Sequence, residues 1–196
     1  MSARDEILGR VRSALRDAPD VPAATVPRRT PDPSVDLVAL FCERVADYRA
    51  VVERCSAADL TDHIRAALPA EARVVVPPGL DLDVPGSVVD HGLSAEELDG
   101  LDAVVTRARL GIAETGTIVL DHGPDQGRRA ITLVPDRHVC VVEAHQVVAD
   151  VPDAVAVLDA ARPATWVSGP SATSDIELDR VEGVHGPRQL HVLVVG

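Results

Sequence analysis

Short apolar runs alternate with segments of helical periodicity along the chain, and this pattern predicts an α/β fold. The runs are rich in valine, which is typical of interior strands, and strands covered on both faces are typical of a largely parallel sheet. Strands are predicted at 51–52, 73–76, 88–89, 103–106, 118–120, 165–168 and 190–195, with further apolar runs at 131–134 and 138–142. Helices are predicted over 2–17, 34–48, 56–68 (with Ser56 as its cap) and 151–161, and a short one after the Ser94–Glu97 capping box.

Proline divides the chain into segments. Prolines at 19, 22, 27, 31 and 33 break helices and extend the backbone between the first predicted helix and the second. We therefore expect an N-terminal helical arm over 1–17, a proline-rich linker over 18–34 and one α/β domain over 35–196. The arm is equally compatible with packing on its own domain and with contact to a partner, so a homo-oligomer formed through the arm is one expectation.

Composition and charge restrict the classes of partner and the location. The formal net charge of −12 disfavours binding to nucleic acid and to an anionic membrane surface. The N-terminal segment is charged and lacks the apolar core of a signal peptide, and no apolar run is long enough to span a bilayer. These features indicate a cytoplasmic protein. The 3 cysteines contain no CxxC pair and the 7 histidines no HExxH, so we predict no metal site in this chain.

The segment GIAETGTIVL, residues 111–120, is predicted to form a tight turn followed by a buried strand. Glu114, Thr115, Gly116 and Thr117 stand just before that strand, and the last three are candidate substrate-binding residues. A carboxylate at this place would act as nucleophile or general base if it were desolvated. The alternative is structural, in which Glu114 caps the turn or pairs with Arg107 or Arg109.

A second polar cluster, SGPSATSD at residues 168–175, follows a predicted strand and leads into a predicted short helix or turn over 171–176. Backbone N–H groups and hydroxyls of such a loop can hold an anion, either phosphate or carboxylate. The candidate binding residues are Ser168, Gly169, Ser171 and Thr173. The loop lacks the ending of a P-loop, and ordinary helix capping is the alternative. Both clusters flank predicted strands, and ligands of open α/β sheets bind beyond the carboxyl ends of the strands.

Histidine supplies the last candidate group. In GVHGPR, residues 183–188, His185 is a candidate acid–base residue or ligand, with a hydrogen bond to backbone in a tight turn as the alternative. His138 and His191 lie at the ends of apolar runs and are expected at the edge of the core.

Four blocks occur in order: ILGRVRSAL, GIAETGTIVL, LVPDRHVCVV and SGPSATSDIELDRVEGVHGPRQLHVLVV. Together they resemble the LUD domain family over nearly the whole chain. The resemblance implies a three-layer α/β/α sandwich with a largely parallel sheet, similar to the sugar-phosphate isomerase and CoA-transferase superfamily. It also implies a component of an L-lactate utilization system, which oxidises L-lactate to pyruvate together with partner proteins that carry iron–sulfur clusters. The sequence lacks the cysteine motifs that hold such clusters, so we expect no cofactor in this chain.

Two functions are compatible with this resemblance. In the first, the chain is a non-redox subunit that binds substrate or organises the complex. In the second, it is a stand-alone transferase-like or isomerase-like enzyme acting on a small carboxylate or an acyl-CoA, with Glu114 as the reacting group. The sequence has no lysine, so arginine must supply any cationic clamp for a carboxylate, and Arg137 is the best-placed candidate.

Overall fold

The computed structural model of the chain describes residues 2–19, 32–173, 181–182 and 186–196. The chain divides into two units, Met1–Thr30 and Pro31–Gly196, and each is described by itself. In the first unit, helix α1 spans Ala3–Ala14. Ser2 caps this helix, because its side chain accepts a hydrogen bond from the backbone N–H of Asp5 and the Asp5 carboxylate accepts one from the N–H of Ser2.

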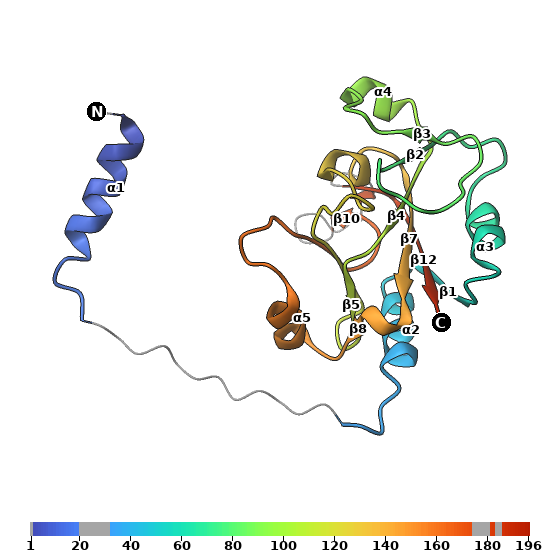
Figure 1. Ribbon diagram of the computed structural model, residues 1–196, viewed down its shortest axis with the longest axis horizontal. Coiled ribbons are helices and arrows are strands. Elements are labelled where there is room, and N and C mark those ends of the chain that lie inside the picture. The colour runs from blue at the N-terminus through green and yellow to red at the C-terminus, as the bar shows by residue number, and fades with distance from the viewer. Residues whose placement is uncertain (1, 20–31, 174–180, 183–185) are drawn as a thin grey trace. The chain divides into compact units, whose positions relative to one another are not determined.

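Six parallel strands form the main sheet of the second unit, in the order β1-β12-β7-β4-β2-β3 (Figure 1). They are β1 (Val51–Cys55), β2 (Val74–Val76), β3 (Val88–Val89), β4 (Ala103–Arg107), β7 (Arg137–Glu143) and β12 (Gln189–Val195). Val141 of β7 pairs with Leu193 of β12 on one side and with Arg107 of β4 on the other. The predicted α/β class with a largely parallel sheet is confirmed.

A second sheet, which the sequence pattern did not predict as such, lies over one face of the main sheet. Its order is β8-β5-β6-β9, with β5 (Leu110–Ile112), β6 (Thr117–Leu120), β8 (Val147–Val148) and β9 (Thr165–Val167). The segment GIAETGTIVL is therefore an antiparallel β5–β6 hairpin, where we expected a turn and a single strand. Strand β5 was missed because glycine, here Gly111, is depleted in strands and reads as part of a turn. A separate antiparallel pair joins β10 (Ala172–Thr173) to β11 (Val181–Glu182).

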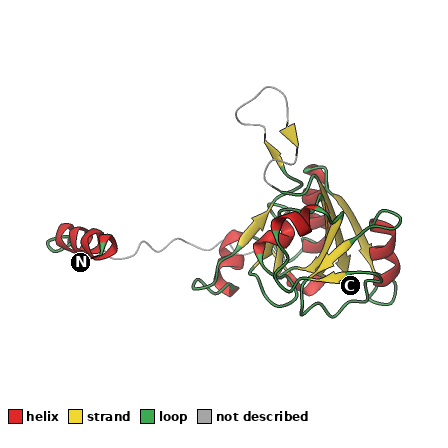
Figure 2. Cartoon of the chain, turned by 90° about the horizontal axis from the view of Figure 1, so that it is seen from above, coloured by secondary structure: helices red, strands yellow, loops and turns green. Residues whose placement is uncertain are grey.

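Helices cover both faces of the main sheet, and Figure 2 shows the strands enclosed between them. The remaining elements are α2 (Leu37–Asp47), α3 (Leu60–Ala67), α4 (Ala95–Asp99), α5 (Val151–Val157), η1 (Arg129–Thr132) and η2 (Ala144–Gln146). On one face α3 buries Ile64 against β7 and β12, and on the other α2 buries Phe41 together with the second sheet. Ala154 of α5 packs on the outer side of that second sheet. In Figure 1, α3 and α5 accordingly lie on opposite sides of the main sheet.

Two predicted helix starts are wrong. The helix expected from Ser56 begins at Leu60, because Ser56 uses its hydroxyl to accept from the N–H of Asp59 in the preceding turn. The short helix or turn expected over 171–176 is replaced by strand β10, in which Ala172 and Thr173 pair with β11, while residues 174–176 lie outside the described part of the chain. Among the described residues, no helix has the length and apolar character needed to cross a membrane.

Candidate functional site

A pocket of about 300 Å³ lies between β9, η1 and the first residues of β7 and β12. Its polar lining consists of Arg129, Thr132, His138, Thr165, Ser168 and Ser171. Leu133, Trp166 and Leu190 contribute apolar surface. A small, partly apolar pocket with a few converging polar groups is the usual form of a small-molecule site.

The pocket lies at the end of the main sheet opposite to the one we expected. His138 and Leu190 are the second residues of their strands and pair with each other, so the pocket lies at the amino ends of β7 and β12. The rule that ligands bind beyond the carboxyl ends applies to loops of the parallel sheet. Ser168 follows a strand of the second sheet, which runs across the face of the first. The rule for parallel strands therefore does not predict the position of Ser168.

The structure brings part of the two predicted clusters together. Strands β6 and β9 pair antiparallel, with Ile118 opposite Val167. As a result the Thr117 hydroxyl lies 2.8 Å from that of Ser168 and 2.7 Å from that of Thr115. The three hydroxyls form a hydrogen-bonded chain that ends at Ser168, on the pocket wall.

Gly116 and Gly169 serve the packing of these loops against the end of α2. Both have positive φ, 59° and 85°, which favours glycine. A Cβ on Gly116 would lie 2.6 Å from the carbonyl carbon of Arg44, and one on Gly169 would lie 2.5 Å from Cβ of Tyr48. The closeness of the helix therefore accounts for both glycines.

Two other candidates lie apart from the pocket lining. Glu114 is exposed in the hairpin turn, and its backbone N–H donates to the carbonyl of Ala149. The desolvation that a catalytic carboxylate would need is not present there. Arg137 donates to the carbonyl of Ala67 at 2.6 Å and to the side chain of Gln189, and it lines a different hollow with Arg188. The roles given to Glu114 and Arg137 stay predictions.

The remaining candidates are at the end of the second cluster and in the third loop. The N–H of Ser171 donates to the carbonyl of Pro187 at 2.8 Å, which closes one side of the pocket. The side chain of Thr173 and all of His185 lie outside the described residues, so their roles stay predictions. The arginines proposed as partners of Glu114 have other carboxylates nearby: Arg107 pairs with Asp81 and Glu143, and Arg109 lies 3.7 Å from Asp121.

His138 is a pocket residue that the sequence analysis placed only at the edge of the core. Its side chain lines the pocket although the residue is 2% exposed. Nε2 lies 2.8 Å from the hydroxyl of Thr106, on the neighbouring strand β4, and that hydroxyl also donates to Sγ of Cys140 at 3.8 Å. Burial lowers the pKa of His138 to about 4 and raises that of Cys140 to about 12, so both side chains are neutral near pH 7.

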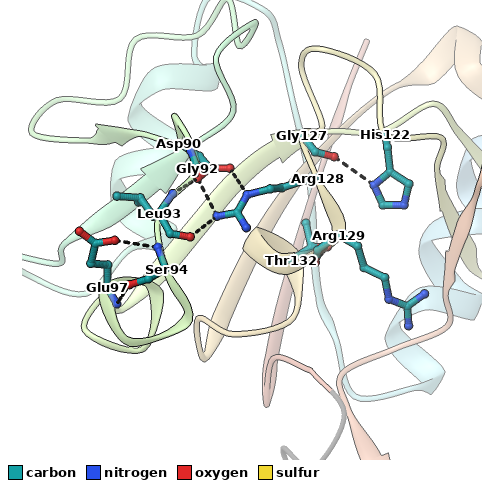
Figure 3. Close-up of polar contacts among 10 residues, drawn as sticks. All are labelled: Asp90, Gly92, Leu93, Ser94, Glu97, His122, Gly127, Arg128, Arg129 and Thr132. Atoms are coloured by element: carbon teal, nitrogen blue, oxygen red, sulfur yellow. Dashed lines mark hydrogen bonds and ion pairs between the residues drawn. The ribbon is translucent and has the colours of Figure 1, made fainter.

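Arg128 and Arg129 are adjacent but point away from each other (Figure 3). Arg128 donates to both carboxylate oxygens of the buried Asp90, at 2.7 and 2.9 Å, and to the carbonyl of Leu93. These bonds hold the pKa of Asp90 below its usual value. Arg129 lines the pocket, and no described residue forms a hydrogen bond or an ion pair with its guanidinium. No role was predicted for either arginine from the sequence.

His122 ties the same loop to the pocket wall. Its backbone has a φ of 57°, uncommon for a residue with a side chain. Its Nδ1 lies 3.0 Å from the carbonyl oxygen of Gly127, and its Nε2 lies 3.0 Å from the hydroxyl of Thr165 on β9. Loop 121–129 is thereby fixed between β9 on one side and Asp90 on the other, as Figure 3 shows in part.

The opposite face of the main sheet carries a separate cluster near α3. The Glu53 carboxylate bonds to Nδ1 of His63 at 2.7 Å, and its other oxygen lies 3.1 Å from Nε2 of His191 without hydrogen-bonding geometry. The bond from His63 is the main cause that lowers the pKa of Glu53. In the described part of the chain, no three His, Cys, Asp or Glu side chains are grouped so that they could hold a metal ion.

Taken together, these features define an α/β protein with a polar pocket beside a largely parallel sheet. The chain belongs to the LUD domain family, whose model matches residues 90–195, and the predicted family is confirmed. It is similar to Lactate utilization protein C of Deinococcus radiodurans, with 46% identity over 99% of this chain and 96% of that protein. The same-named protein of Bacillus subtilis is 31% identical over 46% of this chain and 41% of its own length. A crystal structure of a DUF162 family protein from Deinococcus radiodurans has a TM-score of 0.74 at 43% identity, and the match covers 85% of this chain and 100% of that chain.

Proposed function

We propose that the chain is a non-redox component of an L-lactate utilization system, and that it binds a small carboxylate in the pocket beside β9. The observation that carries the proposal is Arg129, a guanidinium on the pocket wall with no ion pair to a described residue. The name of the Deinococcus radiodurans relative, which matches along nearly the whole chain, supports the lactate utilization part of the proposal.

The pocket lining suits a small carboxylate. A planar guanidinium can donate two parallel hydrogen bonds to a carboxylate, which is stronger and more specific than a bond between neutral groups. The hydroxyl of Ser168, which lies on the same lining, can accept from Thr117 and donate to a remaining oxygen. The apolar side chains of Leu133 and Trp166 offer a surface to a methyl group.

In this proposal the redox step belongs to partner proteins. Oxidation of L-lactate to pyruvate removes two electrons and two protons from the substrate. The sequence has 3 cysteines and no CxxC motif, so we assign the transfer of electrons to iron–sulfur partners, with this chain holding or presenting the carboxylate. The stand-alone enzyme is the weaker alternative, because Glu114 is exposed and does not line the pocket.

Calorimetric titration of the full chain with L-lactate and with pyruvate tests the binding site. Arg129→Gln should weaken binding of the preferred ligand by about tenfold or more, because a hydrogen-bonded charge pair is lost. Arg65→Gln is the matched control: Arg65 is an exposed arginine on α3 that pairs with Asp62, so its loss should leave the affinity unchanged. If neither carboxylate binds, or if the two variants behave alike, the proposed site is wrong.

A second measurement tests the subunit role. Purified chain should not oxidise L-lactate with an artificial electron acceptor, and turnover should require the co-purified iron–sulfur partners. Turnover by the chain alone would contradict the proposal and favour the stand-alone enzyme.

A further inference from the structure

We infer that the pocket recognises the oxygen atom next to the ligand's carboxylate through Nδ1 of His138, which makes small 2-hydroxycarboxylates its preferred ligand class. The inference rests on the proposed function, since Arg129 must hold the carboxylate, and it adds the group that distinguishes one carboxylate from another.

Only one ring nitrogen of His138 is available to a ligand. The imidazole reaches the pocket from β7, and its Nε2 is engaged by Thr106 at 2.8 Å on the inner side. Among the described residues, Nδ1 has no hydrogen-bond partner. It is also not a fully buried atom, because the fully buried polar atoms without a partner do not include it. Nδ1 is therefore the ring atom that can meet a molecule in the pocket.

The proton of Thr106 determines what Nδ1 can do. A threonine hydroxyl has a single proton, and Thr106 donates it to Sγ of Cys140. Its oxygen then accepts from His138, so the ring proton is on Nε2 and Nδ1 presents a lone pair to the pocket. The ring stays neutral near pH 7 because burial lowers its pKa to about 4. The Cys140 thiol does not change this arrangement by ionising, because it is also buried.

A lone pair at this place selects a donor. The hydroxyl of a 2-hydroxycarboxylate can donate to Nδ1 while Arg129 holds the carboxylate. A 2-oxocarboxylate has only acceptor atoms at the same position, and an unsubstituted carboxylate has no oxygen there. A site that hydrogen-bonds a ligand hydroxyl binds analogues that lack it less tightly, because a polar group of the site is otherwise left unpaired.

The test compares three ligands of similar size on the full chain by calorimetry: L-lactate, pyruvate and propionate. We expect L-lactate to bind about fivefold to tenfold more tightly than the other two, the contribution of one hydrogen bond to a neutral group. This comparison uses the parent protein and does not depend on the folding of any variant.

Two substitutions of His138 identify the atom responsible. Glutamine places its amide near the position of Nε2 and can keep the bond to Thr106, whereas asparagine places its amide near Nδ1 and loses that bond. His138→Gln should therefore keep the melting temperature and lose the preference for L-lactate over propionate. His138→Asn should lower the melting temperature and keep most of the preference, with its Oδ1 as acceptor.

The outcomes separate this inference from the proposed function. If all three carboxylates bind equally and Arg129→Gln weakens all of them, the carboxylate site stands and the role of His138 is refuted. If His138→Gln retains the preference for L-lactate, His138 is only a structural partner of Thr106. If none of the three ligands binds the parent, the proposed carboxylate site itself is refuted.

Discussion

The two faces of the main sheet each place a histidine near the amino end of neighbouring strands, in opposite surroundings. On the face covered by the second sheet, His138 meets the neutral hydroxyl of Thr106. On the α3 face, His191 lies beside the carboxylate of Glu53. Burial lowers the pKa of both histidines, but only for His191 does a carboxylate oppose the shift. The same residue type thus provides a fixed neutral group on one face and part of a charged cluster on the other.

Lowering the pH should expose this difference most strongly. The pKa of His138 falls from 6.5 to about 4 on folding, so the unfolded chain takes up the proton first. Its contribution to stability is complete above pH 6.5 and is lost as the pH falls towards 4, by about 3 kcal/mol in all. Urea unfolding of the parent and of His138→Gln at pH 7 and pH 4.5 measures this, and the variant should lose distinctly less stability. Equal losses would show that His138 does not titrate in this way.

Within the pocket face, the adjacent arginines should separate structure from binding. Arg128→Gln leaves the buried carboxylate of Asp90 without its charged partner, and we expect a loss of about 2 kcal/mol, reduced from the fully buried case because Arg128 is itself partly exposed. Arg129→Gln should change stability by less than about 0.5 kcal/mol, because its guanidinium forms no ion pair with a described residue. Urea unfolding at pH 7 checks both values. The assignment fails if Arg129→Gln is the more damaging of the two.

On the α3 face, Glu53→Gln should make His191 resemble His138. The substitution removes the carboxylate that opposes the effect of burial, so the pKa of His191 should fall further below its ordinary value. The loss of stability should be about 1 kcal/mol or less, because Glu53 is partly exposed. In the parent protein, the lowered pKa of Glu53 causes a loss of stability as the pH falls below 4.5, and the variant should lack this loss. NMR titration of the histidine ring protons follows His191 directly, and an unchanged pKa would mean that Glu53 does not act on it.

The smallest effect is expected at Glu114, outside both histidine clusters. Because its side chain is exposed, Glu114→Gln should change stability by less than about 0.5 kcal/mol and leave carboxylate affinity unaltered. Calorimetry beside a melting curve is sufficient. A clear loss of affinity with an unchanged melting temperature would restore Glu114 as a functional residue.

The sequence pattern predicted the parallel sheet well, because Val74–Val76 and the apolar parts of β7 and β12 are local features with a local signal. It also selected Thr117 and Ser168, although nothing local indicated that they would meet across β6 and β9. Arg129 was missed for a similar reason, because the direction in which its side chain points depends on the bond of Arg128 to the distant Asp90.

His138 was missed for another reason. Its position in an apolar strand correctly indicated burial, as for Cys140 two residues later. The pocket beside it exists only because the second sheet and η1 cover the same face. The hydrophobic periodicity of one segment does not indicate with which distant segment it pairs.

Strand order has a consequence for how the protein is made. β12 lies between β1 and β7, yet it follows both of them in the chain. When β1 leaves the ribosome, its partner His191 and the residues around it have still to be synthesised. The hydrogen-bonding edge that β1 later offers to β12 therefore stays open for most of translation, and that of β7 stays open until the end of the chain is made; open edges readily pair with other chains. We expect the nascent chain to need chaperone protection until β12 inserts and joins β1 to the rest of the sheet.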